Sequence, residues 1–353
     1  MTQSAAPVAA DVPHSQPSPP RRAGAWLLDT VSFLAAFILT CAAIGSVAPF
    51  PEVPGIYPKW AHFQQRLDQF DTLFIGSSRF YHQIIPAQFD AAIAAAAGEP
   101  TSSFNFAYDG MWPPESYYLI RKILASKPPR LKWLVIDLMD INVQLDARNK
   151  STLRMTYWHD AQHTWMAFRD ILTSRWSRSK QADLLWQHGR LWFTRATHLG
   201  WGSEALAGCL NPRPPRKKPY SWAENAGFEV GPDRRMEGAE RERFESEVAV
   251  LRKGLKPIAL RPIFREALTD LIAEIRQAGV EPIFVIAPTI NPRENFVDLP
   301  AGAPLIALND PAKHPELFAT DHHYDAWHLN AAGAVHFTRM LAERFVEHTR
   351  PRR

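Results

Sequence analysis

The chain of 353 residues has 46% hydrophobic and 22% charged side chains, the composition of a globular protein that can form one large domain or two small ones. Its formal net charge of +4 is small for this length, so charge gives no argument for nucleic acid as a partner. The two cysteines, Cys41 and Cys209, cannot form a disulfide framework, and we expect no bridge between them. No cysteine pair has the spacing of a metal knuckle.

The N-terminal region is predicted to form a tail and a membrane anchor. Residues 1–22 are rich in Ala, Pro, Ser and Gln and have no apolar period, which is typical of a disordered tail. Residues 23–49 are mostly apolar and carry no charge except Asp29, and their length is about that needed to cross a bilayer, roughly 20 residues. Arg21 and Arg22 precede this segment, which favours a cytoplasmic N-terminus. A cleaved signal peptide and a buried core helix are the alternatives.

Short apolar runs alternate with helical patterns through much of residues 50–353. The runs predict buried strands at residues 73–75, 103–107, 131–138, 281–287 and 305–309. Helices are expected at residues 86–97, 114–126 and 262–278 and from residue 330 onward. Strands that alternate with helices are typical of an α/β domain whose parallel sheet carries helices on both faces.

Residues 147–257 interrupt the alternation and are expected to form a helical insertion or cap beside the sheet. The segment contains seven of the twelve tryptophans: Trp158, Trp165, Trp176, Trp186, Trp192, Trp201 and Trp222. These indoles can pack in the core of the insertion, stack on sugar rings or touch a membrane interface. We interpret the basic run in residues 211–220 as a solvated loop (Arg213, Arg216, Lys217 and Lys218).

The stretch from Asp71 to Arg79, DTLFIGSSR, combines a buried strand with a turn of small residues. Parallel strands of open α/β sheets hold catalytic groups at their carboxyl ends. A serine placed there, at the start of the next helix, has backbone N–H groups beside it and is suited to be a nucleophile. A serine at the same place can also be an ordinary helix N-cap.

Asp325 and His328 form a second candidate, three residues apart and just before a helix that opens at Asn330. On a helical turn this spacing puts both side chains on one side, so Asp325 can fix the tautomer of His328. The other imidazole nitrogen is then available to take a proton from a hydroxyl group. His328 can instead be a capping or core histidine, or these two residues can bind zinc together with His322 and His323.

These motifs together resemble the SGNH (GDSL-type) hydrolases, and more closely their membrane-anchored, DltD-like and polysaccharide O-acetyltransferase branches. The resemblance covers residues 71–142 and 262–345 and leaves out the Trp-rich insertion. It implies a three-layer, flavodoxin-like SGNH domain over residues 50–353, with the insertion at about 147–257. It also implies a single N-terminal transmembrane helix and a catalytic domain on the periplasmic or extracytoplasmic side of the inner (plasma) membrane.

The family motifs assign roles to individual residues. Gly76-Ser77-Ser78 is similar to the first block, whose third residue is the nucleophile, so Ser78 is favoured over Ser77. The segment Asn105 to Gly110 looks like the second block, whose glycine N–H contributes to the oxyanion hole. The last block, Asp-x-x-His, appears as Asp325-Ala326-Trp327-His328.

The chain differs from the family pattern at the third block, which is normally Gly-x-Asn-Asp. Here the third predicted strand ends in Leu138-Met-Asp-Ile-Asn142, without the glycine, and Asn142 is about two positions out of register. Asn142 is the candidate third donor, and the N–H groups of Ser78 and Gly110 alone can also form an oxyanion hole. Loss of one donor typically lowers the rate by about 10²–10³.

The resemblance implies a serine acyl-transfer enzyme, an O-acetyltransferase or esterase, that acts on ester groups of cell-envelope or exported polysaccharide. It implies a Ser78, His328 and Asp325 triad, no cofactor or metal, no nucleic acid, and a membrane-bound O-acyltransferase as the partner. Two alternatives remain: an esterase that works with water and no partner, and a non-catalytic glycan-binding or scaffold protein of an envelope export or acylation complex. The atypical third block is the feature that favours the scaffold.

Overall fold

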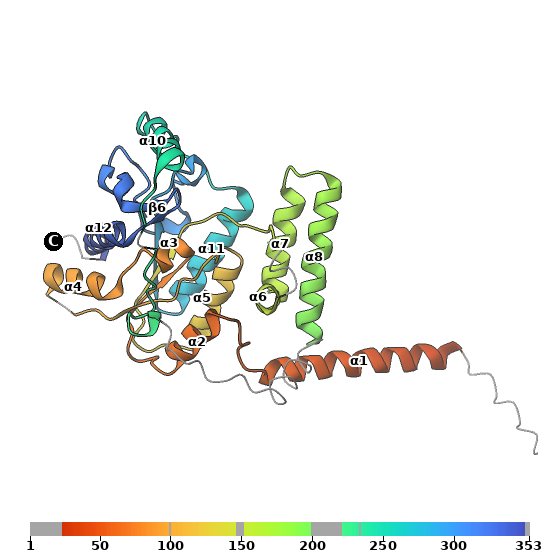
Figure 1. The fold of residues 1–353 in the computed structure, drawn as a ribbon. Coiled ribbons are helices and arrows are strands. Elements are labelled where there is room, and N and C mark those ends of the chain that lie inside the picture. Colours follow the sequence, from red (N-terminus) through yellow and green to blue (C-terminus); the bar gives the residue numbers. More distant parts are fainter. Residues whose placement is uncertain (1–22, 99, 146–151, 199–220, 233, 350–353) are drawn as a thin grey trace, which may run out of the picture. The chain divides into compact units, whose positions relative to one another are not determined.

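The computed structural model describes residues 23–98, 100–145, 152–198, 221–232 and 234–349, and the chain divides into two units, 1–48 and 49–353 (Figure 1). In the first unit, helix α1 (Ala23–Val47) is long and apolar enough to cross a membrane. The predicted tail and the basic run, as well as Cys209 and Trp201, lie outside the described residues.

Within the described residues, the second unit contains a five-stranded sheet in which all neighbouring strands are parallel. In chain order the strands are β1 (Thr72–Ile75), β2 (Ser103–Asn105), β3 (Trp133–Asp137), β4 (Glu281–Ile286) and β5 (Leu305–Ala307). The spatial order, β2-β1-β3-β4-β5, is that of the flavodoxin-like doubly wound fold, with its switch point between β1 and β3. The prediction of an α/β domain with a parallel sheet is confirmed. Four strands are shorter than the runs that predicted them, and β1 is one residue longer.

Two pairs of helices cover the sheet (Figure 1). The first pair is α4 (Pro86–Ala97) and α12 (Ala331–Thr349), and the second is α5 (Glu115–Ala125) and α11 (Pro262–Gln277). Each pair packs together, because each of these helices buries one apolar side. The short helices α2 (Ile56–Gln64) and α3 (Ser78–Tyr81) flank β1 along the chain. Apolar residues of β1, including Leu73 and Phe74, are fully buried between the layers.

The described part of the insertion is helical. It contains α6 (Leu153–Tyr157), α7 (Ala161–Thr173), α8 (Arg178–Thr197) and α10 (Gly238–Arg252), and α7 and α8 lie side by side as a hairpin (Figure 1). Its tryptophans fall into two groups. Trp158 and Trp222 are buried, which fits core packing, whereas Trp165, Trp186 and Trp192 are exposed. Core packing therefore accounts for only part of the set.

The segment around Asp325 and His328 is a β-hairpin, so the expected helical turn is wrong. Strand β6 (His323–Asp325) pairs antiparallel with β7 (His328–Leu329), and Asp325 lies directly opposite His328. Two residues between paired positions close a tight hairpin, which brings the pair together as a helical turn would. The helix begins at Ala331, where Asn330 Oδ1 accepts hydrogen bonds from the next backbone N–H groups.

Replacement of Gly227 by alanine should destabilise the fold more than the same change at Gly98. Both glycines have a positive φ, +92° and +73°, so alanine strains the backbone at each by about 1–2 kcal/mol. A Cβ at Gly227 would lie 2.1 Å from Asn105 O at the end of β2, whereas a Cβ at Gly98 meets nothing within 4 Å. We expect Gly227→Ala to cost roughly 1–3 kcal/mol more, measured by denaturant unfolding of the full chain in detergent. Equal costs would contradict this close contact.

Candidate active site

Ser77 and Ser78 have different roles at the end of β1. Ser77 is the N-cap of α3: its Oγ accepts a hydrogen bond from Arg79 N (3.3 Å) and donates one to Asp137 Oδ2 (2.8 Å). Ser78 is the first residue of α3, and its Oγ lies 2.7 Å from His328 Nε2. Gly76 allows the turn, since a Cβ there would lie 2.4 Å from Asp137 Cβ. Ser77 thus caps the helix and bonds the buried Asp137, whereas Ser78 presents its hydroxyl to the imidazole.

The His328 imidazole is held by Asp325. His328 Nδ1 lies 2.9 and 3.0 Å from the two carboxylate oxygens of Asp325, so we assign its proton to Nδ1 and the acceptor role toward Ser78 to Nε2. Asp325 Oδ1 also accepts the backbone N–H groups of Trp327 (2.8 Å) and His328 (2.9 Å). Burial raises the pKa of Asp325, but these hydrogen bonds lower it more, and the carboxylate is stabilised in its ionised form.

The three side chains are accessible from outside. The side chains of His328 and Asp325 are 20% and 24% exposed, and Ser78 is half-buried. The Tyr324 ring stacks parallel to the His328 ring with centroids 5.3 Å apart, which restricts rotation of the imidazole. Trp327, between the two polar residues of the hairpin, is 49% exposed. A substrate can therefore reach Ser78 without opening of the core.

A buried ionic cluster lies under the turn of Gly76, Ser77 and Ser78, which we call the nucleophile turn after the predicted role of Ser78. The Arg79 guanidinium pairs with Asp137 Oδ1 (3.1 Å) at the end of β3 and with Glu294 after β4. All three residues are at most 6% exposed. Burial lowers the pKa of Arg79, but the two carboxylates raise it more, so the charge is retained. The cluster ties the first turn of α3 to β3 and to the β4 side of the sheet. It is a part of the site that the sequence analysis missed.

The loop after β2 lies beside the nucleophile turn. Tyr108 N donates to Gly76 O (3.1 Å), and Asp109 Oδ1 is 3.0 Å from Nε2 of His82, which follows α3. Gly110 has a φ of +62°, and among the described residues its N–H donates to no acceptor. The N–H of Ser78, in the first turn of α3, has no partner within its own helix. That these two N–H groups serve as oxyanion donors stays a prediction.

Lys59 holds this loop from the inside. Its ammonium is fully buried and donates to Asn105 O (2.9 Å), Ala107 O (2.7 Å) and Gly227 O (2.8 Å). Burial lowers the pKa of Lys59, and the negative charges of Asp109 and Glu229 partly offset this effect. Three carbonyl oxygens need three N–H donors, which only the protonated amine has. Lys59 therefore joins α2, the loop before Gly110 and the returning insertion.

The remaining predicted site residues are placed as follows. Asn142 lies exposed after β3, where its Oδ1 accepts from Gln144 N (3.0 Å) and its N–H donates to Pro113 O (2.9 Å). His322 Nδ1 and His323 Nε2 lie 2.6 and 2.8 Å from backbone carbonyls. Nowhere in the described ranges do three metal-ligating side chains converge, so the geometry gives the zinc alternative no support. The role of Asn142 in the oxyanion hole stays a prediction.

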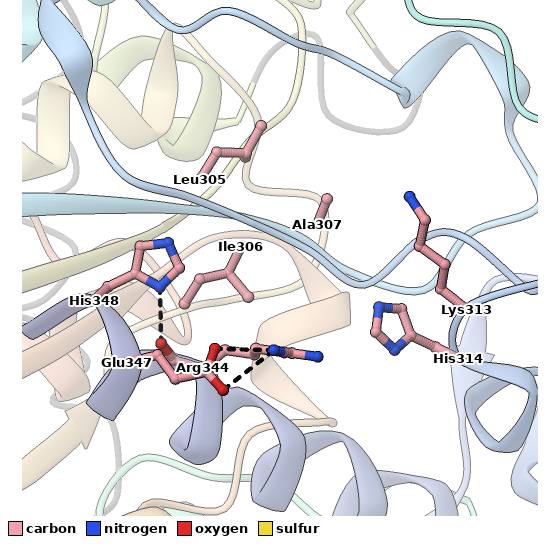
Figure 2. A pocket seen from close by; sticks show the side chains of 8 residues that line it. All are labelled: Leu305, Ile306, Ala307, Lys313, His314, Arg344, Glu347 and His348. Atoms are coloured by element: carbon pink, nitrogen blue, oxygen red, sulfur yellow. Dashed lines mark hydrogen bonds and ion pairs between the residues drawn. The ribbon is translucent and has the colours of Figure 1, made fainter.

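A cavity of about 470 Å³ lies elsewhere, at the edge strand β5. Figure 2 shows that Leu305, Ile306 and His314 line it, and that Arg344 beside them is paired with Glu347 (2.9 Å). None of the triad residues lines this cavity. Lys313, the other charged basic residue of the lining, is paired with Asp310 (3.3 Å), so both cations already face carboxylates and neither defines an anion site. The candidate active site is the exposed group of Ser78, His328 and Asp325.

The chain has no match among known families: no protein-family model matches it, and no curated protein matches its sequence. The resemblance to the SGNH hydrolases therefore stays a prediction from short motifs. What the structure adds is the juxtaposition of their polar side chains at one edge of the sheet.

Lys59→Met should destabilise the protein by roughly 3 kcal/mol or more, because three buried carbonyl oxygens lose their donor. Lys122→Met is the matched control: this lysine is exposed on α5, and its replacement should change the free energy of unfolding by less than about 0.5 kcal/mol. Denaturant unfolding of the full chain in detergent measures both. Equal effects would contradict the bridging role of Lys59.

Proposed function

We propose that the protein is a membrane-anchored serine acyl-transfer enzyme, an esterase or O-acetyltransferase, that acts on ester groups of cell-envelope or exported polysaccharide. One observation carries the acyl-transfer chemistry: the continuous hydrogen-bonded chain from Ser78 Oγ to His328 Nε2 (2.7 Å) and from His328 Nδ1 to Asp325 (2.9 Å). A hydroxyl, a base and a carboxylate in this order are a nucleophile, its proton acceptor and the group that orients the acceptor.

The reaction has two steps at one serine. His328 Nε2 takes the proton of Ser78 as Oγ attacks the ester carbonyl, and Asp325 stabilises the imidazolium. The tetrahedral oxyanion is held by the N–H groups of Ser78 and Gly110, with Asn142 as the predicted third donor. His328 then protonates the leaving alcohol, and an acyl-Ser78 ester remains. Water or a sugar hydroxyl, deprotonated in turn by His328, attacks this ester and releases Ser78.

The location and the substrate class have separate support. The length and apolar composition of α1 support a membrane anchor, and the arginines before it favour a catalytic domain outside the cytoplasm. The polysaccharide substrate, and a membrane-bound O-acyltransferase as partner, are implied by the resemblance to the DltD-like branch. The proposal needs no cofactor, since the three side chains provide nucleophile, base and orienting carboxylate.

A non-catalytic scaffold is the second candidate, favoured by the atypical third block around Asn142. In a scaffold, nothing requires Ser78 to keep a hydrogen bond to a histidine that is itself oriented by a carboxylate. The 2.7 Å contact and the division of roles between Ser77 and Ser78 therefore support the enzyme.

Labelling with a fluorophosphonate tests the nucleophile. We expect the wild-type chain to be labelled and Ser78→Ala to be unlabelled. Ser77→Ala should keep labelling at a reduced rate, because it loses the N-cap and the hydrogen bond to Asp137 but keeps the nucleophile. Asp325→Asn should lower the labelling rate by on the order of 10⁴, since the imidazole then takes the wrong tautomer. An unlabelled wild type would refute the enzyme and leave the scaffold. Loss of labelling in Ser77→Ala alone would move the nucleophile to Ser77.

The predicted role of Asn142 has its own test. If its side chain donates to the oxyanion, Asn142→Ala lowers kcat by about 10²–10³ and leaves KM almost unchanged. Gln144→Ala is the matched control, because this neighbouring residue is also exposed and is not a candidate donor. A wild-type kcat for Asn142→Ala would leave only the Ser78 and Gly110 amides as donors.

Hydrolysis and transfer differ in the fate of the acyl group. An esterase should hydrolyse short p-nitrophenyl esters at a rate that added polysaccharide does not change. A transferase should hydrolyse them slowly and move the acyl group to the added glycan, which mass spectrometry of the glycan detects. We expect the wild-type chain to produce acylated glycan and Ser78→Ala to produce none. Rapid hydrolysis of the p-nitrophenyl ester without any acylated glycan would instead show that the protein is a plain esterase.

A further inference from the structure

The hairpin of α7 and α8 carries large apolar side chains that no part of the described chain covers. On α7, Trp165 and Leu172 are 59% and 51% exposed, and on α8, Trp186 and Phe193 are 73% and 50% exposed. Seven residues separate the members of each pair, so each pair lies on one side of its helix. The buried residues of both helices lie on other sides: His163, Thr164, Met166, Ala167, Asp170, Ile171, Gln181, Leu184, His188 and Leu191.

The two exposed sides meet in one surface, which we call the aromatic face. Gly189 lies between Trp186 and Phe193 on α8, and a Cβ there would be 3.7 Å from the ring of Phe168 on α7. Phe168 follows Trp165 by three positions and belongs to the same side of α7. The apolar surface is therefore continuous across both helices. Contiguous exposed apolar surface of this kind marks a site of interaction with a protein or a membrane.

The charges around the aromatic face favour a membrane. Arg175, Arg178, Lys180 and Arg190 are exposed on α8 and the turn before it, with Asp183 as the exposed acid among them. Tryptophan rings together with lysine and arginine are enriched where protein crosses the headgroup layer of a bilayer. Basic side chains also complement the negative charge of anionic phospholipids.

The first residues of the second unit pack against the insertion that carries this hairpin. Phe50 follows Val47, the last residue of α1, by three positions, and an extended chain of that length spans only about 10 Å. Within the second unit, the Phe50 ring stacks on Trp60 (4.5 Å) and meets the edge of Tyr157 on α6 (5.8 Å). Helix α6 in turn packs against α8.

We propose that the aromatic face of the α7–α8 hairpin inserts into the headgroup layer of the bilayer that α1 spans, with anionic phospholipids as its partner. The proposal rests on the membrane-anchoring part of the proposed function and is independent of the triad. A single helix leaves the domain free to swing above the membrane. A second attachment through the aromatic face fixes its height and orientation, and so fixes the distance of Ser78 from the bilayer.

Spin labels on the full-length chain test this attachment. The protein, with Cys41→Ser and Cys209→Ser as background, is reconstituted into vesicles of phosphatidylcholine and phosphatidylglycerol. Single cysteines are introduced at three positions of the aromatic face: Trp165→Cys on α7, and Trp186→Cys and Phe193→Cys on α8. Ile38→Cys in α1 is the lipid control, and Glu240→Cys, exposed on α10, is the water control. Collision with oxygen, which concentrates in lipid, and with a water-soluble nickel chelate is measured for each.

We expect the three hairpin labels to resemble Ile38→Cys, with an oxygen-to-nickel accessibility ratio severalfold above that of Glu240→Cys. Hairpin labels that are open to nickel while Ile38→Cys is in lipid would overturn this proposal and leave the anchor intact. An Ile38→Cys label open to nickel would refute the anchor itself. Labels that are immobile and shielded from both reagents would indicate a protein contact, most simply a second copy of the chain, and would also overturn the lipid proposal.

Discussion

The hydrogen bond between Ser78 and His328 is the constraint on which the rest of the site depends, because it joins residues 250 positions apart over 2.7 Å. Neither residue can move freely without losing it. Ser78 is fixed by the end of β1 and by α3, and His328 by the paired strands β6 and β7. A parallel sheet suits this task, since its carboxyl edge gathers loops that are distant in sequence. The switch point between β1 and β3 is where Ser78 lies.

Two buried cations make this edge rigid. Arg79 ties α3 to β3 and to the segment after β4, and Lys59 ties the loop before Gly110 to α2 and the insertion. Taking a charge out of water costs several kcal/mol, which only a full set of partners offsets. Both cations have such a set. Their cost is consistent with a place where geometry matters more than stability, because Arg79 holds the nucleophile turn and Lys59 holds the loop that is predicted to supply an oxyanion donor.

The sequence was sufficient to predict the strands of the sheet. It was not sufficient to predict the hairpin and the buried cations that hold the candidate site in place. Apolar runs such as 281–287 predict strands whatever lies around them, and β4 confirms that prediction. The spacing of Asp325 and His328 fits a helical turn and a two-residue hairpin equally well, so proximity was predictable and the local structure was not. Lys59 resembles any lysine of an amphipathic helix, because its three acceptors come from loops that only the tertiary fold brings together.

The openness of the site bears on the fate of an acyl group at Ser78. The imidazole that would activate the second nucleophile is 20% exposed, and the neighbouring Trp327 is 49% exposed. Water therefore reaches His328 in the chain alone, so hydrolysis by the proposed triad would need no further structure. Transfer to a sugar hydroxyl requires that the acceptor or a partner cover this surface and exclude water. A domain held at a fixed height above a membrane can meet such a partner in one orientation, so the attachment proposed for the α7–α8 hairpin favours transfer over hydrolysis.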